Sequence, residues 1–219
     1  SEKMSKSLGN FFTIREVTDK YHPTALRWML LGTHYRAPIN YTQRALEEAS
    51  DRLFYLYQTL GDARVAATEA AEAAAGGTPK PPTGIAAEGI QLAVDVRAAV
   101  DAALADDLNT PLAVASLSAP LKTLNDLTST KKGKKAAGRD VALADLILAV
   151  EDALDAVGLP SKPEDGAKIL DRLRDLTLKR AGVTAEDVEA AIEARRDARA
   201  AKDFEASDAI RDELKAKGV

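Results

Sequence analysis

The sequence predicts an all-α protein. Hydrophobic residues make up 46% of the 219 residues and charged residues 29%, which is the balance of a globular chain. Aromatic residues are only 5%, while alanine and leucine recur, and this composition favours helices. No stretch alternates polar and apolar residues as a half-buried strand would, and no internal repeat is found.

The first third of the chain predicts three helical segments. Residues 13–23 (TIREVTDKYHP) predict a short helix or turn that ends at Pro23, because a proline disfavours helical geometry in the residue before it. Pro23 suits the first position of the next helix, which segment 34–40 (HYRAPIN) interrupts at Pro38. Thr42 is then a suitable N-cap for a long helix. Its apolar stripe is Leu46, Ala49, Leu53, Leu56 and Leu60.

The middle of the chain alternates helices with breaks. Residues 76–84 (GGTPKPPTG) have the composition of a linker, and a helix is expected over about 86–105. The motif DDLNTP (106–111) ends that helix and starts another through a cap and a proline. Residues 128–139 (TSTKKGKKAAGR) predict a solvated basic loop, 141–157 an apolar helix, 161–166 (SKPEDG) a second linker and 169–179 a short helix.

The last segment predicts a helical hairpin. Thr184 caps a helix with Asp187 three residues on, a relative of the capping box, and this helix runs to about Ala201. Asp203 caps the helix that follows.

Composition narrows the classes of partner and site. The net charge is −4, so an RNA contact would need a local basic patch, and no DNA partner is expected. No apolar run approaches the roughly 20 residues that span a bilayer, so no membrane partner is expected. The chain has no cysteine and only two histidines, so no metal site is predicted within it.

The opening KMSKS motif predicts a phosphate-binding loop. Lys3 and Lys6 flank small hydroxyl residues, and Gly9 keeps the following turn open. Such a loop can close on a triphosphate and place ammonium groups against the charge that develops as pyrophosphate leaves. From these five residues alone, a solvated basic loop is the alternative interpretation.

The residues around this motif resemble a known family. KMSKSLGNFFTI is similar to the second signature of class I aminoacyl-tRNA synthetases. Together with LRWMLLGTHYRAPINYT, DDLNTP and the closing ARRDARAAKDFEASDAIRDELKAKGV, it resembles the cysteinyl-tRNA synthetases, in that family's order. The resemblance implies a cysteine–tRNA ligase, which activates cysteine with ATP and transfers it to tRNA(Cys).

The resemblance also implies roles for residues and segments. Lys6 would be catalytic, and Lys3, Ser5, Lys6 and Ser7 would bind ATP, which is used with Mg²⁺. Residues 1–20 would hold the KMSKS loop and the end of the catalytic domain. Stem-contact helices would follow at 21–75, a linker at 76–85, a helical anticodon-binding bundle at 86–183 and a C-terminal hairpin at 184–219. The expected location is the cytoplasm, or the stroma or matrix of an organelle.

Two family features are missing from the sequence. The first signature, of the His-Ile-Gly-His type, is not present, and the zinc site that recognises the thiol of cysteine would need cysteines. Since both would lie upstream of Ser1 and there is no initiator Met, we expect the C-terminal part of the enzyme, inactive alone, with Zn²⁺ only in the missing part. One alternative is a non-catalytic structural or RNA-binding descendant, and another is a relative that ligates cysteine to an amino sugar.

The closing hairpin holds the candidate tRNA-binding residues. Arg195, Arg199 and Lys202 fall at i, i+4 and i+7, and such a row can follow a phosphate backbone. Acidic residues are interleaved with them, so a solvated, salt-bridged face is the alternative. Trp28 is expected in the core, and His34 is expected to cap or pack.

Overall fold

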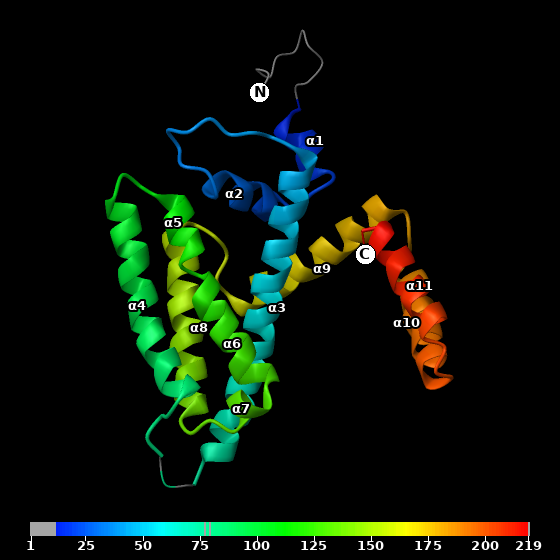
Figure 1. Ribbon diagram of the computed structural model, residues 1–219. Helices are drawn as coiled ribbons and strands as arrows, with labels where there is room; N and C mark the ends of the chain where they lie inside the picture. The colour runs from blue at the N-terminus through cyan, green and yellow to red at the C-terminus, as the bar shows by residue number, and fades with distance from the viewer. Residues whose placement is uncertain (1–11, 77, 79, 219) are drawn as a thin grey trace.

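The computed structural model describes residues 12–76, 78 and 80–218, and in this part of the chain it has helices and no strand (Figure 1). The all-α prediction is therefore confirmed. In chain order the helices are α1 (Ile14–Thr18), α2 (Pro23–Leu31), α3 (Gln43–Ala74), α4 (Ile85–Ala105), α5 (Thr110–Ala115), α6 (Ser118–Ser129), α7 (Lys131–Lys134), α8 (Arg139–Ala156), α9 (Pro163–Ala181), α10 (Ala185–Ala200) and α11 (Phe204–Ala216).

Several helices begin at the polar residues that the sequence marks as caps. The Thr42 hydroxyl accepts a hydrogen bond from the Ala45 amide at 3.1 Å, at the start of α3. The Thr184 hydroxyl accepts from the Asp187 amide at 3.2 Å, and the Asp187 carboxylate accepts from the Thr184 amide at 2.9 Å, which completes the predicted capping box. Asp203 caps α11 through the Ala206 amide at 3.0 Å. These side chains satisfy amides that a helix leaves unpaired at its start.

Two segments differ from the prediction. Residues 161–166 were expected as a linker, yet α9 already begins at Pro163, because a proline at the first position and the acidic Glu164 and Asp165 in the first turn favour a helix start. Residues 128–139 were expected as a loop, yet α6 continues to Ser129 and α7 follows it. The Thr130 hydroxyl caps α7 by accepting from the Gly133 amide at 3.0 Å.

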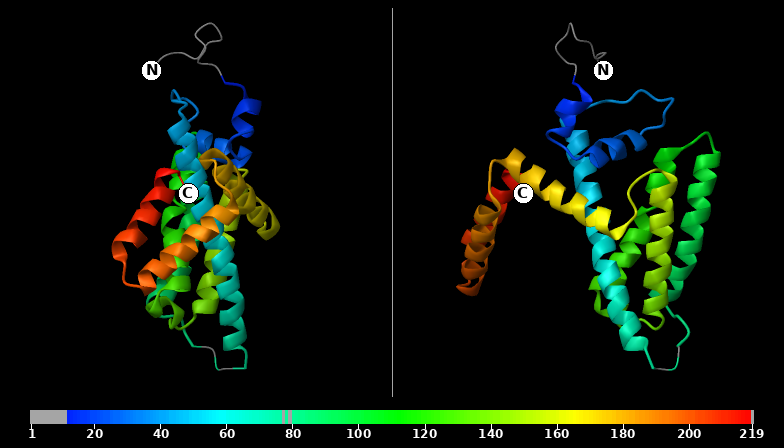
Figure 2. Two further views of the ribbon diagram at one scale, coloured as in Figure 1. Left: turned by 90° about the vertical axis from the view of Figure 1, so that its right-hand side faces the viewer. Right: turned by 180° about the vertical axis from the view of Figure 1, so that it is seen from behind.

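The core lies along α3, the longest helix. Its 32 residues extend over about 48 Å at 1.5 Å per residue. It packs against α2, α6, α8 and α9, and α4 packs along α8 on the far side (Figures 1 and 2). Most of the predicted stripe faces this core, since Ala49, Leu53, Leu56 and Leu60 are buried in it. Leu124, Leu143, Leu146 and Leu154 meet them from α6 and α8. Leu46 is also fully buried, but in a separate, smaller cluster.

Partly buried polar contacts join α3 to the connection between α8 and α9. Arg64 of α3 forms an ion pair with Glu151 of α8 at 2.7 Å and donates to the Ser161 carbonyl at 2.9 Å. The Tyr57 hydroxyl donates to the Pro160 carbonyl at 2.9 Å, and burial raises the pKa of Tyr57 above its usual range. These contacts set the direction in which α9 leaves the bundle.

Helices α10 and α11 form an arm that projects from the end of α9 (Figures 1 and 2). The two helices pack on each other, and the buried Ser207 of α11 lies in this pair. Gly182, at φ 66°, ends α9 in the left-handed conformation and turns the chain into the arm. None of the helices described has the length and apolar character needed to cross a bilayer.

Candidate nucleic-acid interface

The predicted ATP-binding residues Lys3, Ser5, Lys6 and Ser7 lie outside the described residues. The segment that follows them is well anchored. Thr13 and Glu16 form a capping box at α1, in which the Glu16 carboxylate accepts from the Thr13 amide at 2.7 Å. These hydrogen bonds lower the pKa of Glu16. Val17 and Tyr21 then pack with Leu46 in a small second core, so the start of the described chain is held against the first turns of α3.

The THYR and DDLNTP motifs, about 70 residues apart, meet in space. The Tyr35 hydroxyl donates to Asp107 Oδ1 at 2.7 Å, and Arg36 Nε lies 3.1 Å from Asp107 Oδ2. His34 Nε2 lies 3.2 Å from the Asp107 carbonyl, and its ring stacks on Tyr35. We call these four residues the Asp107 joint. The joint ties the connection between α2 and α3 to the turn between α4 and α5.

The backbone of the joint is strained. Asp107 and Leu108 both have φ 53°, in the left-handed region that non-glycine residues avoid, at a cost of order 1–3 kcal/mol each. Asn109 then caps α5 through the Leu112 amide at 3.2 Å, and the Thr110 hydroxyl donates to the Leu31 carbonyl at 2.9 Å. Each motif is visible in the sequence, but no local signal indicates that the two would pair, since the contact is long-range.

The arm places the three candidate tRNA-binding residues differently. Arg195 is half-buried in the pair of helices, and its Nε is enclosed without a hydrogen-bond partner among the described residues. Arg199 is exposed in the last turn of α10. Lys202 lies in the turn after α10 ends at Ala200, with φ 62°, so it does not continue the helical row that the i+7 spacing predicted.

Three acidic residues near these cations are engaged elsewhere, whereas the exposed Asp197 of α10 takes part in no ion pair of the described chain. Glu193 pairs with Arg196 at 2.9 Å, and Asp208 pairs with Arg211 at 2.9 Å. Asp203 accepts a hydrogen bond from the backbone at the start of α11. Within the described chain, no ion pair holds Arg199 or Lys202. Both cations are therefore available to a ligand at the turn between α10 and α11, which we call the tip of the arm.

An exposed aromatic residue completes the tip. Phe204 follows the Asp203 cap and is 61% exposed, beside the turn that holds Lys202. A cationic turn next to an exposed ring is typical of surfaces that contact single-stranded RNA, where bases stack on aromatic side chains. The sequence did not single out Phe204, although an aromatic residue directly after a helix cap was visible.

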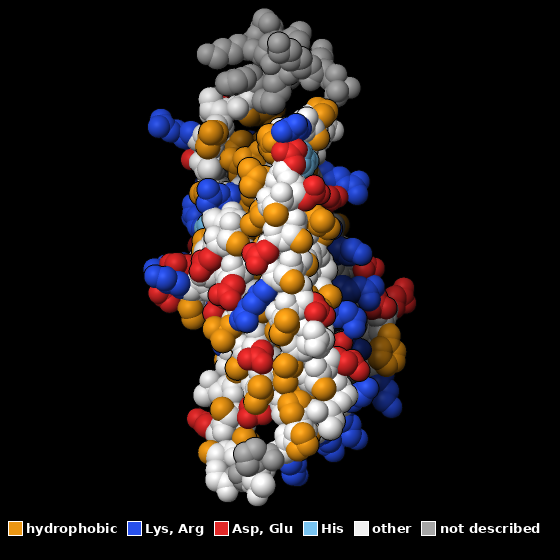
Figure 3. Space-filling model, turned by 90° about the vertical axis from the view of Figure 1, so that its left-hand side faces the viewer, with side chains coloured by type: hydrophobic (Ala, Val, Ile, Leu, Met, Phe, Trp, Pro, Cys, Tyr) orange, Lys and Arg blue, Asp and Glu red, His pale blue; other side chains and the backbone are white. Residues whose placement is uncertain are grey.

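Other basic residues are spread over the molecule. Lys131, Lys132, Lys134 and Lys135 are exposed around α7, at the end of the bundle that lies away from α1 (Figure 1). Positive and negative side chains are interspersed over the face that α4 presents (Figure 3). The structure has no group of three or more His, Asp or Glu side chains that could hold a metal ion in the part of the chain it describes.

Comparison with known proteins finds similarity to tRNA synthetases in each case. The protein-family model for the catalytic domain of class I (C) tRNA synthetases matches residues 1–51. A chloroplastic/mitochondrial cysteine–tRNA ligase of Arabidopsis thaliana is 46% identical over 219 residues, which cover all of this chain and 38% of the relative. The cysteine–tRNA ligase of Anaeromyxobacter sp. (strain Fw109-5) is 41% identical over the whole chain, which covers 41% of that relative. The chain thus spans about two fifths of the length of the relatives it matches, and over all of its own length it is similar to cysteine–tRNA ligases.

Proposed function

We propose that this chain is the C-terminal part of a cysteine–tRNA ligase. The observation that carries the proposal is the similarity to cysteine–tRNA ligases over the whole length of 219 residues, while the family model of the catalytic domain matches residues 1–51. The chain would supply the end of the catalytic domain and the helices that bind tRNA. The relative from Arabidopsis thaliana is named chloroplastic/mitochondrial, so an organellar stroma or matrix is one proposed location and the cytoplasm the other.

The proposed reaction has two steps. Cysteine and ATP give cysteinyl-adenylate and pyrophosphate, and the cysteinyl group then passes to the terminal ribose of tRNA(Cys). Lys3 and Lys6, with Ser5 and Ser7, would hold the phosphates, and Lys6 would act on the negative charge that grows as pyrophosphate leaves. Mg²⁺ would accompany ATP, whereas Zn²⁺ would belong to the part of the enzyme outside this chain.

The tip of the arm would contact the RNA. Support comes from Arg199 and Lys202, which no ion pair of the described chain engages, and from the exposed ring of Phe204, three groups suited to phosphates and bases. Arg180 would hold the root of the arm, and with it this surface, relative to the catalytic side. Arg180 of α9 donates to the Lys20 carbonyl at 2.8 Å and lies 4.6 Å from the centre of the Tyr21 ring. The root of the arm is thereby fastened to the segment between α1 and α2.

The experiment is a binding and activity assay on the purified 219-residue chain. We expect it to bind a tRNA(Cys) transcript more tightly than the same transcript with a changed anticodon, because the arm would read the far end of the tRNA. We also expect no cysteine-dependent pyrophosphate exchange, because the chain lacks the remainder of the catalytic domain. Equal affinity for both transcripts would mean that the chain does not recognise the anticodon. Pyrophosphate exchange by the chain alone would contradict the proposal that catalysis needs the rest of the enzyme.

A further inference from the structure

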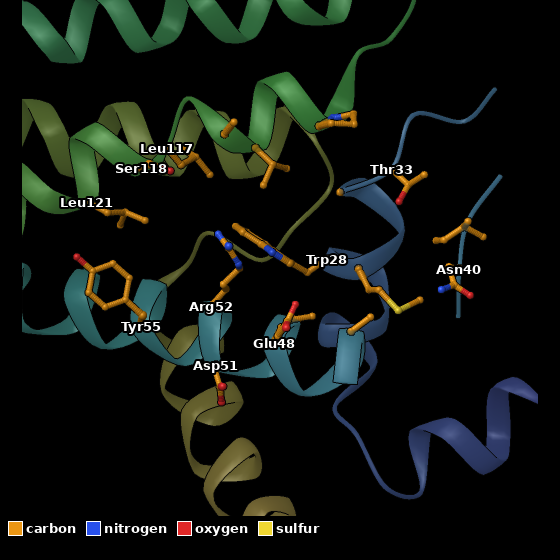
Figure 4. A pocket seen from close by; sticks show the side chains of 18 residues that line it. Trp28, Thr33, Asn40, Glu48, Asp51, Arg52, Tyr55, Leu117, Ser118 and Leu121 are labelled. Carbon is orange, nitrogen blue, oxygen red and sulfur yellow. The ribbon is translucent and has the colours of Figure 1, made fainter. Parts of the chain in front are cut away.

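A cavity of about 790 Å³ lies between the α2–α3 connection, α3 and the α5–α6 pair (Figure 4). Trp28 and Tyr55 form aromatic parts of its wall, and Leu117 and Leu121 line the opposite side. Thr33, Asn40 and Ser118 contribute hydroxyl and amide groups. Apolar and aromatic walls with a few polar groups are typical of sites for small organic ligands, and the volume lies in their usual range.

Arg52 supplies a positive charge to this cavity. Its side chain rises from α3 toward the ring of Trp28, while Asp51 points away from it (Figure 4). Among the described residues, Arg52 forms no ion pair and no hydrogen bond, in contrast to the other cations nearby. Lys122, for example, pairs with Asp126 at 2.9 Å.

One of the two carboxylates that line the cavity, that of Glu48, is already compensated. Glu48 lines the wall one turn before Arg52, but its Oε1 lies 2.8 Å from Arg44 Nε on the previous turn. An anion that enters the cavity would therefore meet the guanidinium of Arg52, while the carboxylate of Asp51, which also lines the cavity, points to the other side of α3 (Figure 4). A planar guanidinium with free N–H groups suits a phosphate, which it can bind through two parallel hydrogen bonds.

An aromatic surface stands next to this anion site. Arg52 and Tyr55 are three residues apart on α3, so both side chains face the cavity. The Tyr55 side chain is 44% exposed, and Asn125 donates to its hydroxyl at 3.5 Å, which leaves the face of the ring available. A planar base can stack on such a ring while the phosphate attached to it reaches Arg52.

We propose that this cavity binds one nucleotide of an RNA strand, with its phosphate on Arg52 and its base against Tyr55. The inference rests on the proposed function, since tRNA supplies the strand. The site lies in the body of the bundle, on α3 and α6, and is separate from the arm. It would give the RNA a second point of contact.

The first test uses tRNA binding by the full 219-residue chain. We expect Arg52→Ala to weaken binding on the order of tenfold and to reduce the salt dependence by a slope of roughly 0.7–0.9. Arg97→Ala is the matched control, because Arg97 is an exposed arginine on α4 that pairs with Asp152. Arg52→Lys keeps the charge but not the planar fork, so its affinity should lie between those of wild type and Arg52→Ala. If Arg52→Ala fails to fold, the tRNA affinity of Arg52→Lys relative to wild type is the deciding measurement.

The second test uses Trp28, the sole tryptophan of the chain, as a reporter. Titration with 5′-GMP should change its fluorescence, guanosine should do so more weakly, and Arg52→Ala should abolish the difference. The comparison with Arg52→Ala separates a response of this cavity from phosphate binding at the proposed ATP-binding residues. If wild type and Arg52→Ala bind tRNA equally, the cavity proposal fails and the proposed function stands. If the wild type binds no tRNA, the proposed RNA function fails. In the fluorescence titration, a GMP response that is identical in wild type and Arg52→Ala would overturn the cavity site.

Discussion

At the scale of single residues, Gly133 and Gly61 show that the space around a glycine determines whether a larger residue could replace it. Gly133 of α7 lies against the end of α6, where an added Cβ would stand 2.1 Å from the Asp126 carbonyl oxygen and 2.6 Å from Leu127 Cα. Gly61, within α3, has open space in the same position, with nothing within 4 Å of an added Cβ. The two glycines therefore have opposite physical roles, one required by packing and one only a cost to the helix.

The same substitution should act in opposite directions at these two positions. We expect Gly133→Ala to lower the free energy of unfolding by about 1–3 kcal/mol, because backbone atoms must move apart. Gly61→Ala should raise it by about 0.5–1 kcal/mol, because alanine is the better helix former. Urea unfolding followed by circular dichroism measures both. Equal effects of the two changes would contradict the close packing of α7 on α6.

His22 gives a pH-dependent contribution at the start of α2. Its Nδ1 accepts a hydrogen bond from the Thr24 amide at 3.1 Å, which requires a neutral ring, and burial, with Arg172 nearby, lowers the pKa of His22. The unfolded chain then binds a proton more readily than the folded one, so stability falls as the pH drops through about 6.5.

His22→Asn tests this contribution, since asparagine is also an N-cap acceptor but does not titrate. Between pH 7.5 and 5.5 the wild type should lose more of its free energy of unfolding than the variant does. Unfolding midpoints measured across this range give the comparison. Parallel pH profiles of the two proteins would mean that folding does not change the pKa of His22, which would contradict its burial at the start of α2.

At the scale of elements, local signals predicted most helices, and long-range contacts escaped prediction. Thr42, Thr184 and Asp203 marked helix starts because capping is a local hydrogen bond. The start of α9 at Pro163 was missed, because the glycine, proline and charges of SKPEDG also suit a linker. The Asp107 joint could not be foreseen, because nothing in either motif specifies its partner.

The candidate site was predictable only in part. Arg199 was identified from its spacing along one helix, and the structure leaves it exposed. The end of α10 at Ala200 places Lys202 in a turn, and the packing of α10 on α11 encloses part of Arg195. Helix ends and helix partners depend on tertiary structure, so the three residues could not be sorted from the sequence. The roles of the KMSKS residues stay a prediction.

The arm should contribute to RNA affinity through the cations of its tip. We expect Arg199→Ala with Lys202→Ala to weaken tRNA binding at low salt and to flatten its salt dependence by a slope of roughly 0.7–0.9 for each phosphate that is no longer neutralised. Arg195 is left intact because it packs between the helices. Arg196→Ala, on the same helix but paired with Glu193, is the control. Coincident salt plots for all three proteins, at equal helicity, would mean that the tip is only solvated.

At the scale of the whole molecule, two sets of contacts join residues 12–51 to the rest of the chain. These residues lie in the segment that the catalytic-domain family model matches. The Asp107 joint connects the end of α2 with α4 and α5 of the bundle. Arg180 connects the α1–α2 turn with the root of the arm. These contacts would keep the proposed RNA-binding surfaces in a fixed relation to residues 12–51, as the two steps of the proposed reaction would require.

The proposed role of this chain is to work as part of an enzyme that attaches cysteine to tRNA. The direct measurement is cysteine transfer to a tRNA(Cys) transcript by the longer polypeptide of which this chain is proposed to be a part, with and without Lys6→Ala. We expect charged tRNA with the wild type. Lys6→Ala should lower single-turnover adenylate formation on the order of 10²-fold or more with ATP affinity little changed, since Lys6 would act mainly on the transition state. Transfer of cysteine to an amino sugar instead of tRNA, a native product of only 219 residues, or an unchanged rate for Lys6→Ala would contradict this role.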